Sequence, residues 1–201
     1  MPDCEVIVHE PEQVETFSQD WPDNRLFYCT AQGGEFMNFV DYEGIICLID
    51  ADTTIQRGIT DSELVGITPK RGQFTACLHA YPAVKLHESR QWLLPTEDFV
   101  VNQKYIEISA AMLIAHSEDW KKMRDLYVRH FKVIKNKLRH HAATQWLISF
   151  LIQKHFSLKI GPAWLHNAIW YRGTKAEISK GMLVVRNTPV IFNHTKWNAN
   201  Q

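Results

Sequence analysis

Two aspartates directly after an apolar stretch are the first residues whose types and spacing could support chemistry. The stretch Ile45–Ile49 reads IICLI, which favours a β-strand, and Asp50 and Asp52 follow it. Alternate residues of a strand point to the same face, so the two carboxylates would project together. Such a pair can bind Mg²⁺ or Mn²⁺. The alternative is an Asp-rich turn that ends the strand and has no ligand.

The same run is similar to motifs of two metal-dependent families. With Thr54 in register, IDADTT resembles the DxDx[T/V] start of haloacid-dehalogenase-type phosphotransferases. It is also similar to the DxD motif of some glycosyltransferases. Either resemblance implies that Asp50 and Asp52 are the metal-binding residues.

A second pair of acids lies in the stretch Leu93–Ser109, LLPTEDFVVNQKYIEIS, where Glu107 follows Asp98 after nine residues. The Pro-x-x-Asp and the Glu in an apolar run resemble, over this part of the chain, PD-(D/E)xK nucleases, in particular TnsA-type transposon endonucleases. The resemblance implies that Asp98 and Glu107 are catalytic and bind Mg²⁺ or Mn²⁺, with Glu63 as an upstream helical carboxylate. Ser109 occupies the family's lysine position, so the sequence leans toward a protein that is not an enzyme; as an enzyme it would be a metal-dependent nuclease.

The charge of the chain reverses beyond its middle. Residues 1–120 hold seven Lys+Arg and 20 Asp+Glu, a net charge of −13, whereas residues 121–201 hold 15 Lys+Arg and two Asp+Glu, a net charge of +13. A balanced total that is divided in this way indicates two parts with different partners. Because cations neutralise phosphates, the basic part favours a nucleic acid as its partner, and DNA before RNA.

The basic part begins with a segment that has the pattern of an amphipathic helix. Ser117 is placed as its N-cap, and apolar residues then recur every three or four positions up to Leu138. Most of the cations fall outside this stripe and would face solvent. The predicted phosphate contacts are Lys121, Lys122, Arg124, Arg129, Lys132, Lys135 and Arg139, with Arg172 and Arg186 further along the chain.

Two functions from different classes fit these observations. The leading hypothesis is a nucleic-acid-binding protein, an accessory or cleavage-related subunit of a phage or mobile element. The rival is a non-enzymatic interaction or inhibitor protein whose acidic N-terminal half binds a basic surface on a protein partner. The rival requires the cations of residues 121–139 to pair with carboxylates of the same chain.

The elements that would position these residues change character along the chain. Short apolar runs between Gly- and Asp-containing turns predict antiparallel strands, whereas later segments have helical periodicity. The predicted strands are 26–30, 35–40, 45–49, 64–68, 73–79 and a C-terminal pair within 182–192; residues 105–115 fit a strand or a helix. The predicted helices begin at Ser117, cover 142–156, and run from Pro162 to about Arg172, with Thr174 as the cap of a fourth.

This order of elements predicts an α+β fold with an antiparallel β-rich N-terminal half and a helical, winged-helix-like C-terminal half. We expect an acidic domain over 1–116 and a basic domain over 117–201, or one unit that contains both. The four separated cysteines form no CxxC pair, which indicates reduced thiols. No apolar run reaches the roughly 18 residues that span a bilayer, so we expect a cytoplasmic protein with no membrane partner.

Overall fold

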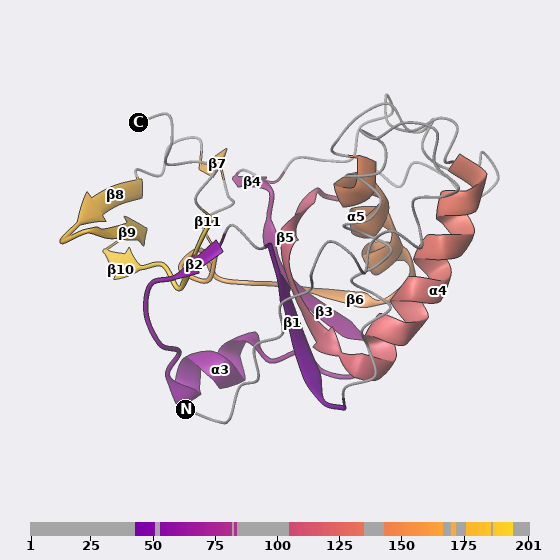
Figure 1. Cartoon of the computed structure of the whole chain (residues 1–201), viewed down its shortest axis with the longest axis horizontal. Helices are drawn as coiled ribbons and strands as arrows, with labels where there is room; N and C mark the ends of the chain where they lie inside the picture. Colours follow the sequence, from indigo (N-terminus) through magenta and orange to yellow (C-terminus); the bar gives the residue numbers. More distant parts are fainter. Residues whose placement is uncertain are drawn as a thin grey trace, which may run out of the picture.

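The computed structural model describes residues 43–50, 53–81, 83, 105–134, 143–166, 170–171, 176–185 and 187–194. Within them the chain is a mixed α/β protein with three helices and a central four-stranded sheet (Figure 1). The predicted strands at 26–30 and 35–40 lie outside these residues. The central strands are β1 (Ile45–Ile49), β3 (Gln73–Leu78), β5 (Ile108–His116) and β6 (Ser157–Ile160), in the order β1-β5-β3-β6.

The central sheet is mixed rather than wholly antiparallel. Strand β5 pairs antiparallel with both β1 and β3, whereas β3 pairs in parallel with β6. The predicted strands 45–49 and 73–79 are confirmed, and the ambiguous stretch 105–115 is mostly strand β5. Its apolar run does not alternate because β5 lies inside the sheet with both faces covered, as is usual for a buried strand.

One face of the sheet is covered by α4 (Ser117–Ile134) and α5 (Ala143–His155), which lie side by side (Figure 1). Both helices were predicted. Their apolar side chains pack on the sheet around Phe74, whose ring contacts the Trp120 ring edge-on at 5.1 Å. The core therefore contains residues from both sides of the predicted domain boundary near residue 117. Its buried members include Phe74, Ile108, Trp120, Met123, Tyr127, Leu147, Phe150 and Leu151.

Helix α3 (Asp61–Ile67) replaces the strand that was predicted over 64–68, so that prediction is wrong. Thr60 and Glu63 form a capping box, in which each side chain bonds the backbone N–H of the other residue. Two orphan N–H groups of the first turn are thereby satisfied, which favours a helix over the extended conformation. Ile67 then closes the second face of the sheet together with Leu165 and Ile191.

The C-terminal region is made of short strands. Of the pair predicted within 182–192, the first strand is confirmed as β9 (Met182–Val185). Its partner β10 (Thr188–Pro189) lies in the segment predicted as the connection, and β8 (Ala176–Ser179) is the third strand of that sheet. The helix predicted from Pro162 is wrong within the described residues: 163–165 form one turn, and Trp170–Tyr171 is strand β7, paired with β4 (Ala80–Tyr81).

The physical reason is that the backbone near Pro162 pairs with distant segments. The Ile191 and Phe192 N–H groups donate to the carbonyls of Trp164 and Leu165 at 2.8 and 3.0 Å. Those carbonyls would otherwise be needed inside a helix. Strand β11 (Phe192–His194) continues from there and pairs with β2 (Thr53–Ile55), while β8 replaces the short helix predicted after Thr174. Among the described residues, no helix has the length and apolar character needed to cross a membrane.

Candidate nucleic-acid interface

Helix α4 divides its side chains between the core and solvent, as its periodicity predicts. Trp120, Met123 and Tyr127 recur at spacings of three and four and are buried against the sheet and α5. The Trp120 indole N–H donates to the Ile46 carbonyl at 3.3 Å, so its one polar atom is satisfied inside the core. The charged residues of α4 lie outside this stripe, on the side of the helix that faces solvent.

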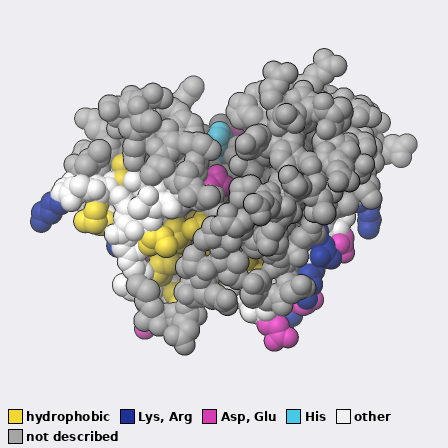
Figure 2. Space-filling model, viewed as in Figure 1, with side chains coloured by type: hydrophobic (Ala, Val, Ile, Leu, Met, Phe, Trp, Pro, Cys, Tyr) yellow, Lys and Arg dark blue, Asp and Glu magenta, His cyan; other side chains and the backbone are white. Residues whose placement is uncertain are grey.

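The outward face of α4 is where the cations are found. Figure 2 shows Lys and Arg side chains interspersed with Asp and Glu along the outer side of this helix. Lys121 pairs with Glu118 at 3.2 Å, and Arg124 pairs with Asp125 at 3.2 Å. Both pairs are formed within the helix and are solvent-exposed, so each contributes at most about 1 kcal/mol and can open at little cost.

Two cations of this face have no acidic partner among the described residues. Lys122 and Arg129 are exposed, and in the part of the chain that the structure describes no carboxylate pairs with either of them. The Lys122 ammonium lies over the Phe156 ring, 5.1 Å from its centroid, which orients the side chain while its charge stays in water.

The structure describes the remaining predicted phosphate contacts only in part. Lys132 lies within the last turn of α4, and its side chain is not among those described. Four further residues lie wholly outside the described part of the chain: Lys135, Arg139, Arg172 and Arg186. Their assignment as phosphate contacts stays a prediction.

Asp50 directly follows β1. Its backbone N–H donates to the Ala111 carbonyl at 3.0 Å, and its own carbonyl accepts from the Thr53 N–H at 3.1 Å. This geometry fits the strand-ending turn that was the alternative to a metal site. Asp52 lies outside the described residues, so a joint metal role of the two aspartates stays a prediction.

Glu107 lies one residue before β5 and is buried, with 3% of its surface exposed. Leu78 pairs with Ile108, which places His79 opposite Glu107, and the His79 N–H donates to the Glu107 carbonyl at 3.3 Å. Ser109, at the lysine position of the nuclease motif, is also buried, and its hydroxyl accepts from the Ala111 N–H at 3.3 Å. A neutral hydroxyl in this place cannot supply a lysine's positive charge.

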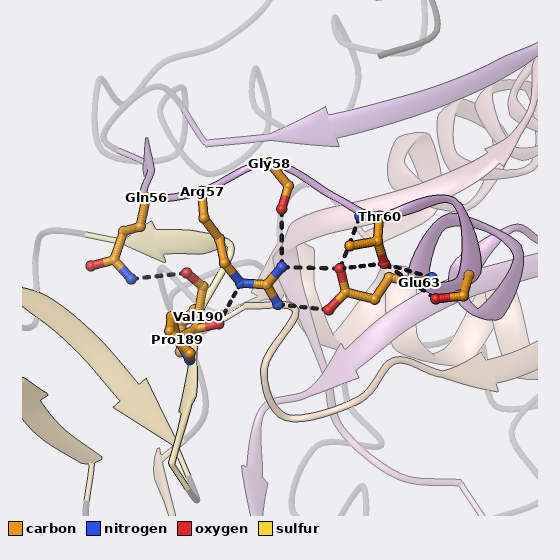
Figure 3. Close-up of polar contacts among 8 residues, drawn as sticks. Gln56, Arg57, Gly58, Thr60, Glu63, Pro189 and Val190 are labelled. Carbon is orange, nitrogen blue, oxygen red and sulfur yellow. Dashed lines mark hydrogen bonds and ion pairs between the residues drawn. The ribbon is translucent and has the colours of Figure 1, made fainter.

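The Glu63 carboxylate binds Arg57 and Thr60, which are near it in the sequence, and does not pair with Glu107 in a common site. Both of its carboxylate oxygens accept from the Arg57 guanidinium, at 2.8 and 3.0 Å, and one also accepts from the Thr60 backbone N–H at 3.0 Å (Figure 3). Helix α3 precedes the start of β3, whereas Glu107 lies beside the end of β3, so the two carboxylates belong to opposite ends of that strand.

The described residues do not assemble the predicted carboxylate site. No group of three or more His, Cys, Asp or Glu side chains within them could hold a metal ion, and Asp98 lies outside them. A role for Asp98 and Glu107 with Mg²⁺ or Mn²⁺ therefore stays a prediction. Among the described residues, the outward face of α4 is the feature that matches a predicted function.

Comparison with known proteins adds no assignment. No protein-family model matches the chain, and no curated protein matches its sequence. The function is therefore argued from the residues and contacts alone.

Proposed function

We propose that this protein binds nucleic acid, with DNA as the first candidate, by contacting phosphates through the outward face of α4. The observation that carries the proposal is the division of this helix. Its apolar stripe is fixed in the core by Trp120, Met123 and Tyr127, so the cations are presented from a rigid support. Lys122 and Arg129 on the opposite side have no acidic partner within the described residues.

The charge of the surrounding sequence supports this partner. The three acids of α4, Glu118, Asp119 and Asp125, all lie in its first half. From residue 126 to residue 176 the sequence contains no Asp or Glu. A long segment with cations and no anions generates a positive potential that attracts a polyanion and accelerates its association.

The contacts also help to separate the proposal from the rival, an interaction or inhibitor protein. That hypothesis needs the helix cations to be neutralised by carboxylates from the acidic half. Where Lys121 and Arg124 do form ion pairs, their partners are residues of α4 itself. Within the described residues no ion pair connects α4 to residues 1–116, whereas the rival hypothesis predicts such pairs.

We propose binding without cleavage, as expected for an accessory subunit of a phage or mobile element. Ser109 supplies no positive charge at the motif's lysine position, and Glu63 is engaged by Arg57. The three-stranded sheet β8–β10 is compatible with the wing of a winged-helix module, and that finer assignment stays part of the proposal.

The test is a fluorescence-anisotropy titration of a labelled DNA duplex, with single-stranded DNA and RNA as further probes. Each phosphate contact on a duplex contributes about 0.9 to the slope of log K against log salt. A Lys122→Gln/Arg129→Gln variant should therefore have a slope lower by up to about 1.8 than the wild type. The matched control is Lys180→Gln, because Lys180 is exposed in the β8–β9 turn, away from α4.

Two results would refute the proposal: binding that does not depend on salt, or equal affinities of the Lys122→Gln/Arg129→Gln and Lys180→Gln variants. The same samples with Mg²⁺ and Mn²⁺ are then examined on a denaturing gel. Metal-dependent cuts that disappear in Asp98→Ala would show that the protein is a nuclease and not only a binder.

A further inference from the structure

The turn between α3 and β3 has a fixed conformation. The Gln73 N–H donates to the Lys70 carbonyl at 3.0 Å, and the Gln73 side chain accepts from the Lys70 N–H at 3.2 Å. Gly72 has a φ of +74°, which a type II turn requires at its third position and which favours glycine. The sequence Lys70-Arg71-Gly72-Gln73 thus forms a β-turn with two cations in it.

This turn is joined to the start of α4 and to β6 through Gly72. The Gly72 N–H donates to the Asp119 carboxylate at 2.8 Å. The Gly72 carbonyl accepts from the Ser157 N–H at 2.9 Å and from the Ser157 hydroxyl at 3.2 Å. Asp119 belongs to the first turn of α4, and Ser157 is the first residue of β6.

Two more contacts stabilise the approach to the turn. The His116 ring lies 3.2 Å from the Pro69 carbonyl, and the Lys159 ammonium donates to the Thr68 carbonyl at 3.0 Å. The turn is therefore attached to β5, α4 and β6 at once. Its backbone is held by the same elements that support the cationic helix.

The side chains of Lys70 and Arg71 are exposed, and within the described residues neither forms a hydrogen bond or an ion pair. Lys122 lies near Lys70 and Arg71, because the residues next to it in the structure also contact the turn. It is three residues beyond Asp119, and its ammonium covers Phe156, the neighbour of Ser157. Asp119 and Ser157 are the two residues that bind Gly72, so the turn and Lys122 border the same part of the surface.

We infer that Lys70 and Arg71 form a second phosphate-contacting element of the α4 surface. The inference rests on the proposed nucleic-acid binding and extends it to a segment of the acidic half. The carboxylate that contacts this turn, that of Asp119, accepts from the Gly72 N–H. An arginine can bind a phosphate with two parallel N–H bonds, so Arg71 is the better suited of the pair.

Two cationic elements in a fixed relation favour a continuous backbone over an isolated anion. The turn and the helix are attached to each other before binding, so no backbone ordering is needed when a strand of phosphates contacts both. Contacts to phosphates carry no sequence information. We therefore expect this surface to bind duplexes of different sequence with similar affinity.

The experiment compares Lys70→Gln/Arg71→Gln with the wild type, Lys122→Gln/Arg129→Gln and Lys180→Gln on one labelled 20-bp DNA duplex. Loss of two phosphate contacts should lower the salt slope by about 1.8. The ratio of wild-type to variant affinity should then fall about 12-fold between 50 and 200 mM salt, which is fourfold in salt raised to the power 1.8. Lys70→Arg/Arg71→Lys keeps both charges and should keep the wild-type slope.

The outcomes separate the inference from the proposed function. If Lys70→Gln/Arg71→Gln binds like Lys180→Gln while Lys122→Gln/Arg129→Gln is weakened, the turn is not a contact and the inference is wrong, although α4 still binds. If the wild type shows no salt-dependent binding, both fail. Because the Lys70 and Arg71 side chains are exposed and form no hydrogen bond or ion pair within the described residues, the melting temperature of Lys70→Gln/Arg71→Gln should match the wild type, which excludes misfolding as the cause of weak binding.

Discussion

Replacement of Glu63 by alanine should destabilise the protein by about 1.5–3 kcal/mol. Glu63 accepts from both terminal nitrogens of Arg57, at 3.0 and 2.8 Å, and from the backbone N–H of Thr60 at 3.0 Å (Figure 3). Loss of a helix-capping interaction costs about 0.5–2 kcal/mol. Loss of a two-pronged but partly solvated ion pair adds about 1 kcal/mol. For a chain of this length, the melting temperature should fall by roughly 3–12 °C.

The effect should depend on pH in a defined direction. The hydrogen bonds from Arg57 and from the Thr60 N–H lower the pKa of Glu63 from 4.5 to about 2 in the folded protein. A carboxyl group with a depressed folded pKa stabilises the protein above its unfolded pKa, and this stabilisation is lost as the pH falls toward the folded pKa. The stability difference between the wild type and Glu63→Gln should therefore shrink between about pH 4.5 and pH 2.

Urea unfolding at pH 7 and thermal melts at decreasing pH measure both effects. The matched control is Glu118→Ala, because that side chain is 62% exposed and makes one ion pair, with Lys121. We expect the control to cost less than about 0.5 kcal/mol. A loss for Glu63→Ala no larger than that of the control would refute the structural role, and the residue could then be reconsidered as a catalytic carboxylate.

Three further predictions concern stability and reactivity. Gln56→Ala should lower the free energy of unfolding, measured in urea titrations, by about 2 kcal/mol. The Gln56 side chain accepts from the Leu183 N–H at 2.9 Å and donates to the Leu183 carbonyl at 3.2 Å, and both bonds would be lost. A loss below about 0.5 kcal/mol would contradict this prediction. Gly161→Ala should lower the melting temperature, because the added Cβ would lie 3.1 Å from the Cys77 sulfur in a packed region. An unchanged melting temperature would show that the side chains around residue 161 can shift to accept the methyl group. In a thiol titration at pH 8, Cys47→Ser should remove one fast-reacting thiol, because Cys47 is exposed. Cys77→Ser should remove none, because burial raises the pKa of the Cys77 thiol to about 12. Fast reaction of Cys77 would refute its burial.

The sequence predicted elements that depend on local pattern. Strand β1 and helices α4 and α5 follow from apolar runs and from the spacing of Met123, Leu126 and Tyr127. Helix α3 also had a local signal, the Thr60-x-x-Glu63 capping box, which the apolar run at 64–68 obscured. The three apolar residues Leu64, Val65 and Ile67 fit a short strand as well as a helix, so the pattern alone did not reveal the helix.

The remaining features depend on contacts between distant segments, which periodicity does not report. Gly72 and Asp119 are 47 positions apart, and nothing in either local sequence indicates that they bond. For this reason Lys70 and Arg71 were counted with the acidic half, although the structure attaches them to the basic helix. The parallel pairing of β3 with β6 was hidden in the same way.

That pairing has a consequence for how the chain folds. Strand β3 lies between β5 and β6, and the Ser157 hydroxyl bonds the Gly72 carbonyl across 85 positions. Closing so long a loop costs entropy before any contact compensates for it, and parallel pairs of this kind form slowly. During synthesis, one edge of β3 stays unpaired until β6, which ends at residue 160, has left the ribosome. Over that interval the edge is open to pairing with another chain, which raises the risk that the growing chain aggregates.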